Sequence, residues 1–202
     1  TGRWTIGGRM TDVRLADDRL LPKELIPAAS LSFGGLRNQY RRDGLGAELV
    51  AVTAKRVVSK GSDEIPWSET PFPAITAVAR FPGETLEQVL STYQVEVIGY
   101  DPYRQDSVDM AGVQAPLAAN FTSGYGLWLA RSGFARQSLL TLVGRGEVLE
   151  RPHVYLLQPF DPDRRIVVML HGLASSPEAW INVANEVLGD EELRRNYQIW
   201  QV

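Results

Sequence analysis

The chain has 202 residues, of which 44% are hydrophobic and 22% charged, a composition typical of a folded globular protein and unlike that of a disordered one. Its formal net charge of -3 argues against a nucleic-acid-binding protein, which would normally carry a basic face. The lack of cysteine excludes disulfides, thiolate zinc sites and a cysteine nucleophile. We therefore expect a globular protein with no nucleic-acid partner.

Neither end of the sequence has the features of a natural terminus. The chain starts at Thr1, with neither an initiator methionine nor the apolar core of a signal peptide. It finishes on a strand-like stretch, 197–202, that no turn or polar tail follows. We therefore expect a chain that is truncated at both ends. No apolar run reaches the roughly 18 residues that a membrane-spanning helix needs.

Residues 1–146 have the pattern of a mixed α+β region. The first 70 residues are interrupted by glycine and proline and give few clear signals, so we expect them to be rich in loops. From Pro71 onward the signals sharpen. Alternation and helical periodicity predict a strand over 75–81, a helix over 85–93, a strand over 94–100, a buried helix that ends at Ser132 and Gly133, and a helix over 135–143.

The last third of the chain predicts an alternation of strands and helices. A strand over 153–158 and a turn over 159–163 come first. The unbroken apolar run 166–170 is typical of a strand that is covered on both faces in a mostly parallel sheet. It ends at His171-Gly172.

A well-marked helix follows this strand. Ser175 and Glu178 have capping-box spacing, and Pro177 suits the first turn. One apolar stripe is formed by Trp180, Val183, Ala184, Val187 and Leu188. Gly189 predicts the end of the helix, after which 190–196 predicts a short charged helix and 197–202 a final strand. The order strand, helix, strand predicts a right-handed parallel crossover.

The segment His171-Gly172-Leu173-Ala174-Ser175-Ser176-Pro177, between an apolar strand and an amphipathic helix, resembles the α/β-hydrolase superfamily. More narrowly, it is similar to the bacterial lipase and esterase-like serine hydrolases. The likeness covers about residues 150–202. It implies an α/β fold in which 147–202 is the N-terminal part of a hydrolase domain and 1–146 is an accessory region. The implied function is the hydrolysis of a carboxylic ester, with no metal or organic cofactor.

The resemblance also assigns the site residues. Acyl transfer places negative charge on the carbonyl oxygen of the substrate, and backbone N–H groups stabilise that charge. The resemblance implies that the N–H of Leu173 is one such donor, that Gly172 lets the backbone approach the substrate, and that His171 supports the loop. In the family the second donor follows the nucleophile of a Gly-x-Ser-x-Gly elbow.

The catalytic triad is expected to lie beyond this chain. No Gly-x-Ser-x-Gly motif occurs in the sequence, and in the family the acid and the catalytic histidine follow the nucleophile. We therefore expect the parent gene to encode the elbow after another helix or so, then an acidic residue and a histidine. Two alternatives stay open: a non-catalytic partner-binding module on a hydrolase-like scaffold, and an α/β-hydrolase with an Asp nucleophile.

Other polar residues favour structural roles. His153 is interpreted as a strand histidine, and Asp161 and Asp163 as turn residues. Arg37, Arg41 and Arg42 form a small basic cluster that is expected to face solvent. The motif over 144–146 lacks the strand that a phosphate-binding loop needs.

Partners and location follow from the resemblance alone. It implies a small-molecule or lipid ester as substrate. Some similar bacterial hydrolases are exported cell-envelope lipoproteins, so the resemblance allows a cell-envelope location, with membrane association through a missing N-terminal signal. The sequence does not exclude a cytoplasmic location. We also expect the isolated chain to be poorly soluble, with the edge of the final strand and one apolar face of the sheet uncovered.

Overall fold

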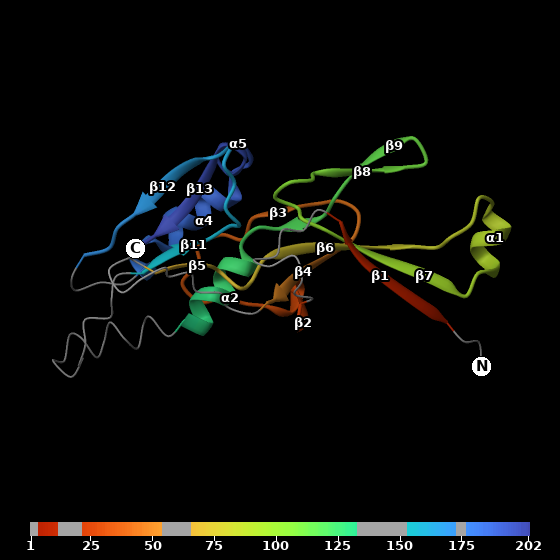
Figure 1. Ribbon diagram of the computed structural model, residues 1–202, viewed down its shortest axis with the longest axis horizontal. Coiled ribbons are helices and arrows are strands. Elements are labelled where there is room, and N and C mark those ends of the chain that lie inside the picture. Colours follow the sequence, from red (N-terminus) through yellow and green to blue (C-terminus); the bar gives the residue numbers. More distant parts are fainter. Residues whose placement is uncertain (1–3, 12–21, 54–65, 133–152, 173–176) are drawn as a thin grey trace.

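The computed structural model describes residues 4–11, 22–53, 66–132, 153–172 and 177–202. The molecule is elongated, with β1, β7 and α1 at one end and the sheet around β12 and β13 at the other (Figure 1). Strands and helices are mixed along the chain, which confirms an α/β class in general terms. The predicted helix over 135–143 and the motif over 144–146 lie outside the described residues.

The first large sheet has five strands in the order β1-β7-β6-β4-β2. These strands are β1 (Thr5–Thr11), β2 (Glu24–Pro27), β4 (Ala47–Val52), β6 (Ala74–Arg80) and β7 (Gln94–Tyr100). β1 runs parallel to β7, and the other neighbours are antiparallel. β6 and β7 confirm the two strands predicted in this region. Three of the five strands lie within the first 70 residues, where mainly loops were expected.

The helix between β6 and β7 is α1 (Leu86–Ser91), a shorter helix than the one predicted. It starts with a capping box in which the Thr85 side chain accepts from the Gln88 backbone N–H and the Gln88 side chain accepts from the Thr85 backbone N–H. These two bonds satisfy backbone donors that a helix start otherwise leaves free.

The second large sheet has four strands in the order β12-β13-β11-β5. They are β5 (Trp67–Glu69), β11 (Val154–Leu156), β12 (Arg165–Met169) and β13 (Tyr197–Gln201). β12 and β13 are parallel and are joined through the 3-10 helix η2 (Pro177–Trp180) and the helices α4 (Ile181–Gly189) and α5 (Glu191–Asn196). The predicted strand, helix and parallel strand are confirmed.

Several short elements lie outside the two large sheets. They are the 3-10 helix η1 (Ala28–Ser30), the antiparallel pair β3 (Arg41–Arg42) and β10 (Ala119–Asn120), and the hairpin β8 (Ser107–Met110) and β9 (Val113–Pro116). β10 leads directly into α2 (Ser123–Ser132), which confirms the predicted buried helix. Its predicted end at Ser132 and Gly133 stays a prediction, because residues 133–152 lie outside the described residues.

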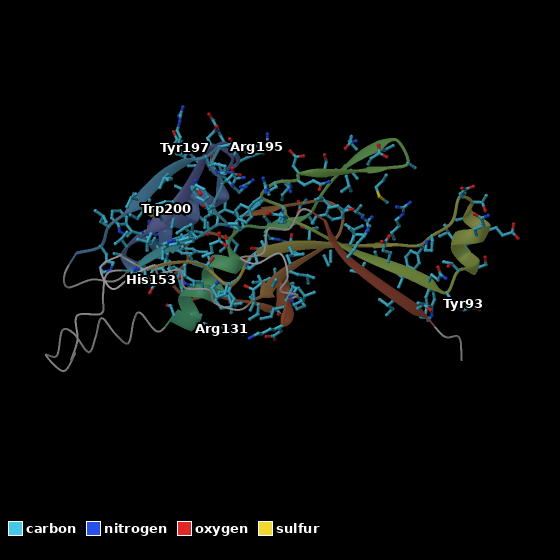
Figure 2. The ribbon with its side chains drawn as sticks, viewed as in Figure 1. Tyr93, Arg131, His153, Arg195, Tyr197 and Trp200 are labelled. Carbon is cyan, nitrogen blue, oxygen red and sulfur yellow. The ribbon has the colours of Figure 1, made fainter. Side chains whose placement is uncertain are left out.

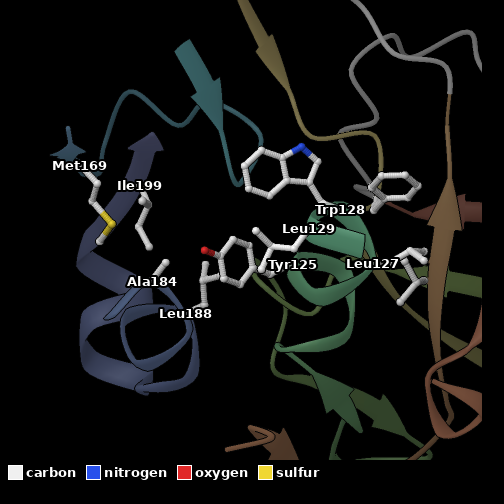
Figure 3. Packing of buried hydrophobic residues seen from close by; sticks show 10 residues of the cluster. Tyr125, Leu127, Trp128, Leu129, Met169, Ala184, Leu188 and Ile199 are labelled. Atoms are coloured by element: carbon white, nitrogen blue, oxygen red, sulfur yellow. The ribbon is translucent and has the colours of Figure 1, made fainter. Parts of the chain in front are cut away.

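One hydrophobic core joins the residues on both sides of position 147. α2 contributes Tyr125, Leu127, Trp128 and Leu129, and the C-terminal elements contribute Met169, Ala184, Leu188 and Ile199. In Figure 3, Tyr125 and Leu129 of α2 point toward Leu188 and Ile199, whereas Leu127 lies on the other side of the helix. β5 likewise adds a strand from before residue 147 to the sheet of β11–β13. The division into an accessory region 1–146 and a domain from 147 stays a prediction, and any such division cuts through this shared core.

The strand β12 differs from its prediction, which had it covered on both faces. Among the described residues β12 lies at the edge of its sheet, paired only with β13. Val167 and Met169 point to the core, whereas Ile166, Val168 and Leu170 are 43%, 53% and 64% exposed. The expectation that the final strand would be the open edge is also wrong, because β13 lies between β12 and β11.

α4 also begins differently from the predicted capping box. Its N-cap is Trp180, with no side-chain capping bond, and η2 precedes it. Ser175 lies outside the described residues, as does the side chain of Glu178. In the predicted apolar stripe Ala184 and Leu188 are buried, but Val183 is 48% exposed.

Gly189 ends α4 as predicted, but the reason for glycine is a close contact. A Cβ atom added to Gly189 would overlap the aromatic ring of Tyr40. Tyr40 is held in place because its hydroxyl donates to Glu186 and its backbone N–H donates to Thr122 Oγ1 at 2.9 Å. The ring therefore has little freedom to yield.

Gly189→Ala should lower the free energy of unfolding by about 1–3 kcal/mol, the usual cost of overpacking. The sign is opposite to that of an unobstructed Gly→Ala exchange in a helix. Urea unfolding followed by circular dichroism measures the change. Gly34→Ala is the matched control, because a Cβ at Gly34 meets nothing within 4 Å. Equal stability of the two variants would contradict the proposed contact.

Candidate functional site

The candidate site lies where β12 and β13 end, at the carboxyl edge of two parallel strands. Their pairing continues one step past the strands, since Val202 N donates to Met169 O at 3.0 Å and His171 N donates to Val202 O at 3.3 Å. Ligands of open α/β sheets commonly bind at such an edge. The His-Gly loop thus leaves the sheet from a fixed position.

A tryptophan anchors the same loop from the helix side. Trp180 Nε1 donates to the carbonyl of Leu170 at 3.0 Å, so the start of the loop and the start of α4 are tied together. Behind them, Ala184 and Leu188 of α4 pack in one cluster with Ile199 of β13. The loop is therefore carried by a strand and a helix that the core holds in position.

The structure places His171 and Gly172 on the surface at this edge. His171 Nδ1 lies 3.0 Å from the carbonyl oxygen of Gly172, and the His171 ring makes no other hydrogen bond with a described residue. The supporting role of His171 in the loop stays a prediction, and this contact is compatible with it. Leu173 lies outside the described residues, so its role as an oxyanion donor stays a prediction.

A serine and a histidine do meet elsewhere in the structure. Ser68 Oγ on β5 and His153 Nε2, next to β11, lie 2.9 Å apart. Ser68 is only 1% exposed, and its backbone pairs with Tyr155 in the parallel ladder of β5 and β11. A nucleophile has to reach a substrate carbonyl. The pair therefore links two strands, in agreement with the interpretation of His153 as a strand histidine.

The turn over 159–163 is confirmed. The carboxylate of Asp161 accepts the backbone N–H of Asp163 at 3.1 Å, which is typical turn chemistry.

The expectation that the basic cluster of Arg37, Arg41 and Arg42 faces solvent is partly wrong. Arg37 and Arg41 are exposed, and Arg41 pairs with Glu48 at 3.0 Å. Arg42 is instead partly buried and donates to backbone carbonyls.

Sequence reasoning missed a polar cavity of about 430 Å³. Its lining consists mainly of charged residues from four separate segments: Arg42, Pro102, Tyr103, Arg104, Gln105, Asp106, Asp161, Asp163, Arg164, Arg194 and Arg195. Only Arg42, Asp161 and Asp163 had been singled out from the sequence, and none of them for binding. The local signal is weak because the arginines are spread over 150 positions of the chain.

Comparisons with known proteins give no independent assignment. No protein-family model, curated protein or solved structure matches the chain. Within the described part of the chain, no group of three or more histidine, aspartate or glutamate residues could hold a metal ion. No helix of that part is long and apolar enough to cross a membrane.

Proposed function

We propose that the complete protein is a serine hydrolase of carboxylic esters and that this chain supplies its oxyanion-hole loop. The observation that carries the proposal is the order of β12, His171-Gly172, α4 and a parallel β13. This arrangement places the start of the loop at the carboxyl edge of a sheet, where its backbone N–H groups are proposed to meet the substrate. Such donors stabilise the oxyanion of acyl transfer when their position is fixed before the reaction.

The anchoring of the loop supports this proposal. An oxyanion donor is effective only if it does not need to reorganise during the reaction. Two hydrogen bonds hold the segments that flank the loop, which are the C-terminal end of β12 and the N-terminal end of α4. They run from His171 N to Val202 O and from Trp180 Nε1 to Leu170 O. The contact of the His171 ring with Gly172 O adds a third restraint.

The nucleophile is proposed to lie after residue 202. No Gly-x-Ser-x-Gly motif occurs in the chain, and Ser68 is buried beside His153. A purified complete protein should hydrolyse an activated ester such as p-nitrophenyl butyrate and become labelled by a fluorophosphonate at one serine. Peptide mapping should place that serine downstream of residue 202.

Ser68→Ala provides the control in the same experiment. We expect the variant to keep its ester turnover and its labelling, and to lose only the hydrogen bond to His153, a loss of about 1 kcal/mol in the free energy of unfolding. Loss of labelling in a folded Ser68→Ala protein would move the nucleophile to β5 and overturn the proposal. Turnover without any labelled serine would instead indicate the Asp-nucleophile alternative.

A further inference from the structure

The charged cavity is lined by residues from both the N-terminal and the C-terminal parts of the chain, next to α5. Arg42 comes from β3, Arg104 from the turn after β7, Arg164 from the turn before β12, and Arg194 and Arg195 from α5. Figure 2 labels Arg195 near the top of this region. The lining contains five arginines and three aspartates, although the whole chain has a net charge of -3. The positive charge is therefore concentrated locally.

Two of these arginines already have carboxylate partners. Arg195 Nη2 lies 2.6 Å from Asp106 Oδ2 and 2.7 Å from Glu191 Oε1. Arg164 Nε lies 3.6 Å from Asp161 Oδ2. In contrast, no ion pair within 4.0 Å joins Arg42, Arg104 or Arg194 to a carboxylate of the described residues.

Arg42 is held at the cavity by backbone carbonyls. Its Nε donates to Leu117 O at 2.7 Å, and its Nη2 donates to Pro102 O at 3.4 Å and to Gln105 O at 3.3 Å. These bonds fix the plane of the guanidinium and leave Nη1 without a hydrogen-bond partner among the described residues. A planar guanidinium that is fixed in this way presents its remaining N–H groups in a defined direction.

Arg194 is held at the cavity by backbone carbonyls of α4. Its Nη1 donates to the carbonyls of Leu188 at 3.0 Å and Gly189 at 2.8 Å, at the end of α4. Its guanidinium carbon lies 3.5 Å from the ring centroid of Phe121, and that of Arg42 lies 5.6 Å from the same centroid. Nε and Nη2 of Arg194 have no hydrogen-bond partner among the described residues.

No nitrogen of Arg42 or Arg194 is among the described polar side-chain atoms that are buried without a hydrogen-bond partner. In the described part of the chain, the buried polar side-chain atoms that lack a hydrogen-bond partner belong to Gln158, Trp200 and Gln201. Burial is the main cause that lowers the pKa of both Arg42 and Arg194, and the charge of Arg42 lowers the pKa of Arg194 further. A bound anion would offset this cost, since it compensates buried positive charge.

We propose that this cavity binds the phosphate group of a small soluble molecule. A dianionic phosphoryl group offers several acceptor oxygens, which suits a cavity lined by the guanidinium donors of Arg42, Arg104 and Arg194. A cavity of about 430 Å³ has the size of a small-molecule site. The inference does not depend on the proposed hydrolase function, because the cavity lies apart from the His-Gly loop.

Titration calorimetry on the full chain tests the proposal, with a buffer free of phosphate and a fixed ionic strength. Inorganic phosphate, glycerol 3-phosphate, malonate and vesicles that contain phosphatidic acid are separate arms. We expect saturable one-to-one binding of phosphate or glycerol 3-phosphate, and malonate at least tenfold weaker. Equal binding of malonate would overturn the preference for phosphate, and binding to the vesicles alone would overturn the small-molecule ligand.

Three variants locate the site. Arg194→Lys keeps the charge but loses the planar fork, and we expect about tenfold weaker binding. Arg104→Gln should also weaken binding, by about three- to tenfold, and its side chain is exposed and makes no hydrogen bond with a described residue. Arg80→Gln, an exposed arginine on β6, should bind like the parent chain.

Thermal unfolding without ligand shows whether each variant is folded. If Arg194→Lys does not fold, the folded Arg104→Gln variant decides. Absence of phosphate binding by the parent chain, or parent-like binding by folded Arg104→Gln and Arg194→Lys, would overturn the site.

Discussion

Trp128→Ala should lower the free energy of unfolding by about 3–5 kcal/mol, the usual cost of deleting a large buried aromatic side chain. Trp128 is 5% exposed. Its ring is stacked on Tyr125 with 5.8 Å between the centroids and lies 5.4 Å from Tyr155 of β11. The lost contacts thus connect α2 with the C-terminal sheet. We expect the two parts to lose stability together, because they share one core.

Urea unfolding of the full chain measures the change, and hydrogen exchange of the β6 and β13 amides shows where it acts. Trp4→Ala is the matched control. Trp4 is 55% exposed and makes only edge contacts with Phe81 and Tyr93 among the described residues, so its loss should be much smaller. If Trp128→Ala left the hydrogen-exchange protection of the β13 amides unchanged, the two parts would not share one cooperative core. The predicted domain boundary at residue 147 would then gain support.

The elements that sequence analysis predicted well have local causes. The sequence of β7 alternates over 94–100, and α1 carries its capping box in Thr85 and Gln88. α2 is rich in large apolar residues, and all of 125–129 are buried. These signals depend on residues within a few positions of each other, so no knowledge of the rest of the fold is required.

The neighbours of each strand could not be predicted in the same way. An apolar run such as 166–170 indicates a strand, but it contains no information on which strand lies beside it. β12 has an exposed face because, in the described structure, only β13 pairs with it. Likewise, the pairing of β5 with β11 joins segments that are 87 positions apart at Trp67 and Val154, and no local pattern marks it.

The two candidate sites also differ in how far the sequence could predict them, because only one of them is formed by a continuous segment. The His-Gly loop is continuous in sequence, so its place after β12 could be predicted. The arginine cavity combines Arg42, Arg104, Arg164 and Arg194 from four segments. Each residue has the appearance of an ordinary surface charge in the sequence. The packing of β3 and α5 around Phe121 brings Arg42 and Arg194 together, and no local pattern in the sequence marks this contact.

The second large effect is expected at Leu173 in the complete protein. Leu173→Pro removes the backbone N–H that is proposed to bind the oxyanion, and kcat for an activated ester should fall roughly 10²- to 10³-fold, the usual loss for one such donor. Leu173→Ala keeps this N–H and should cost little beyond packing. The two variants therefore separate the backbone donor from the side chain.

A folding control is needed because proline also restricts the loop conformation. Each variant should keep the thermal transition of the parent, and the nucleophilic serine should still take up one equivalent of fluorophosphonate, since labelling reports that the serine and its base are intact. Under these conditions a fall in kcat for Leu173→Pro alone identifies a lost donor. A folded Leu173→Pro protein that turns over the ester at the parent rate would show that the loop after β12 does not supply the oxyanion hole, because the remaining donors would then account for the whole stabilisation of the transition state.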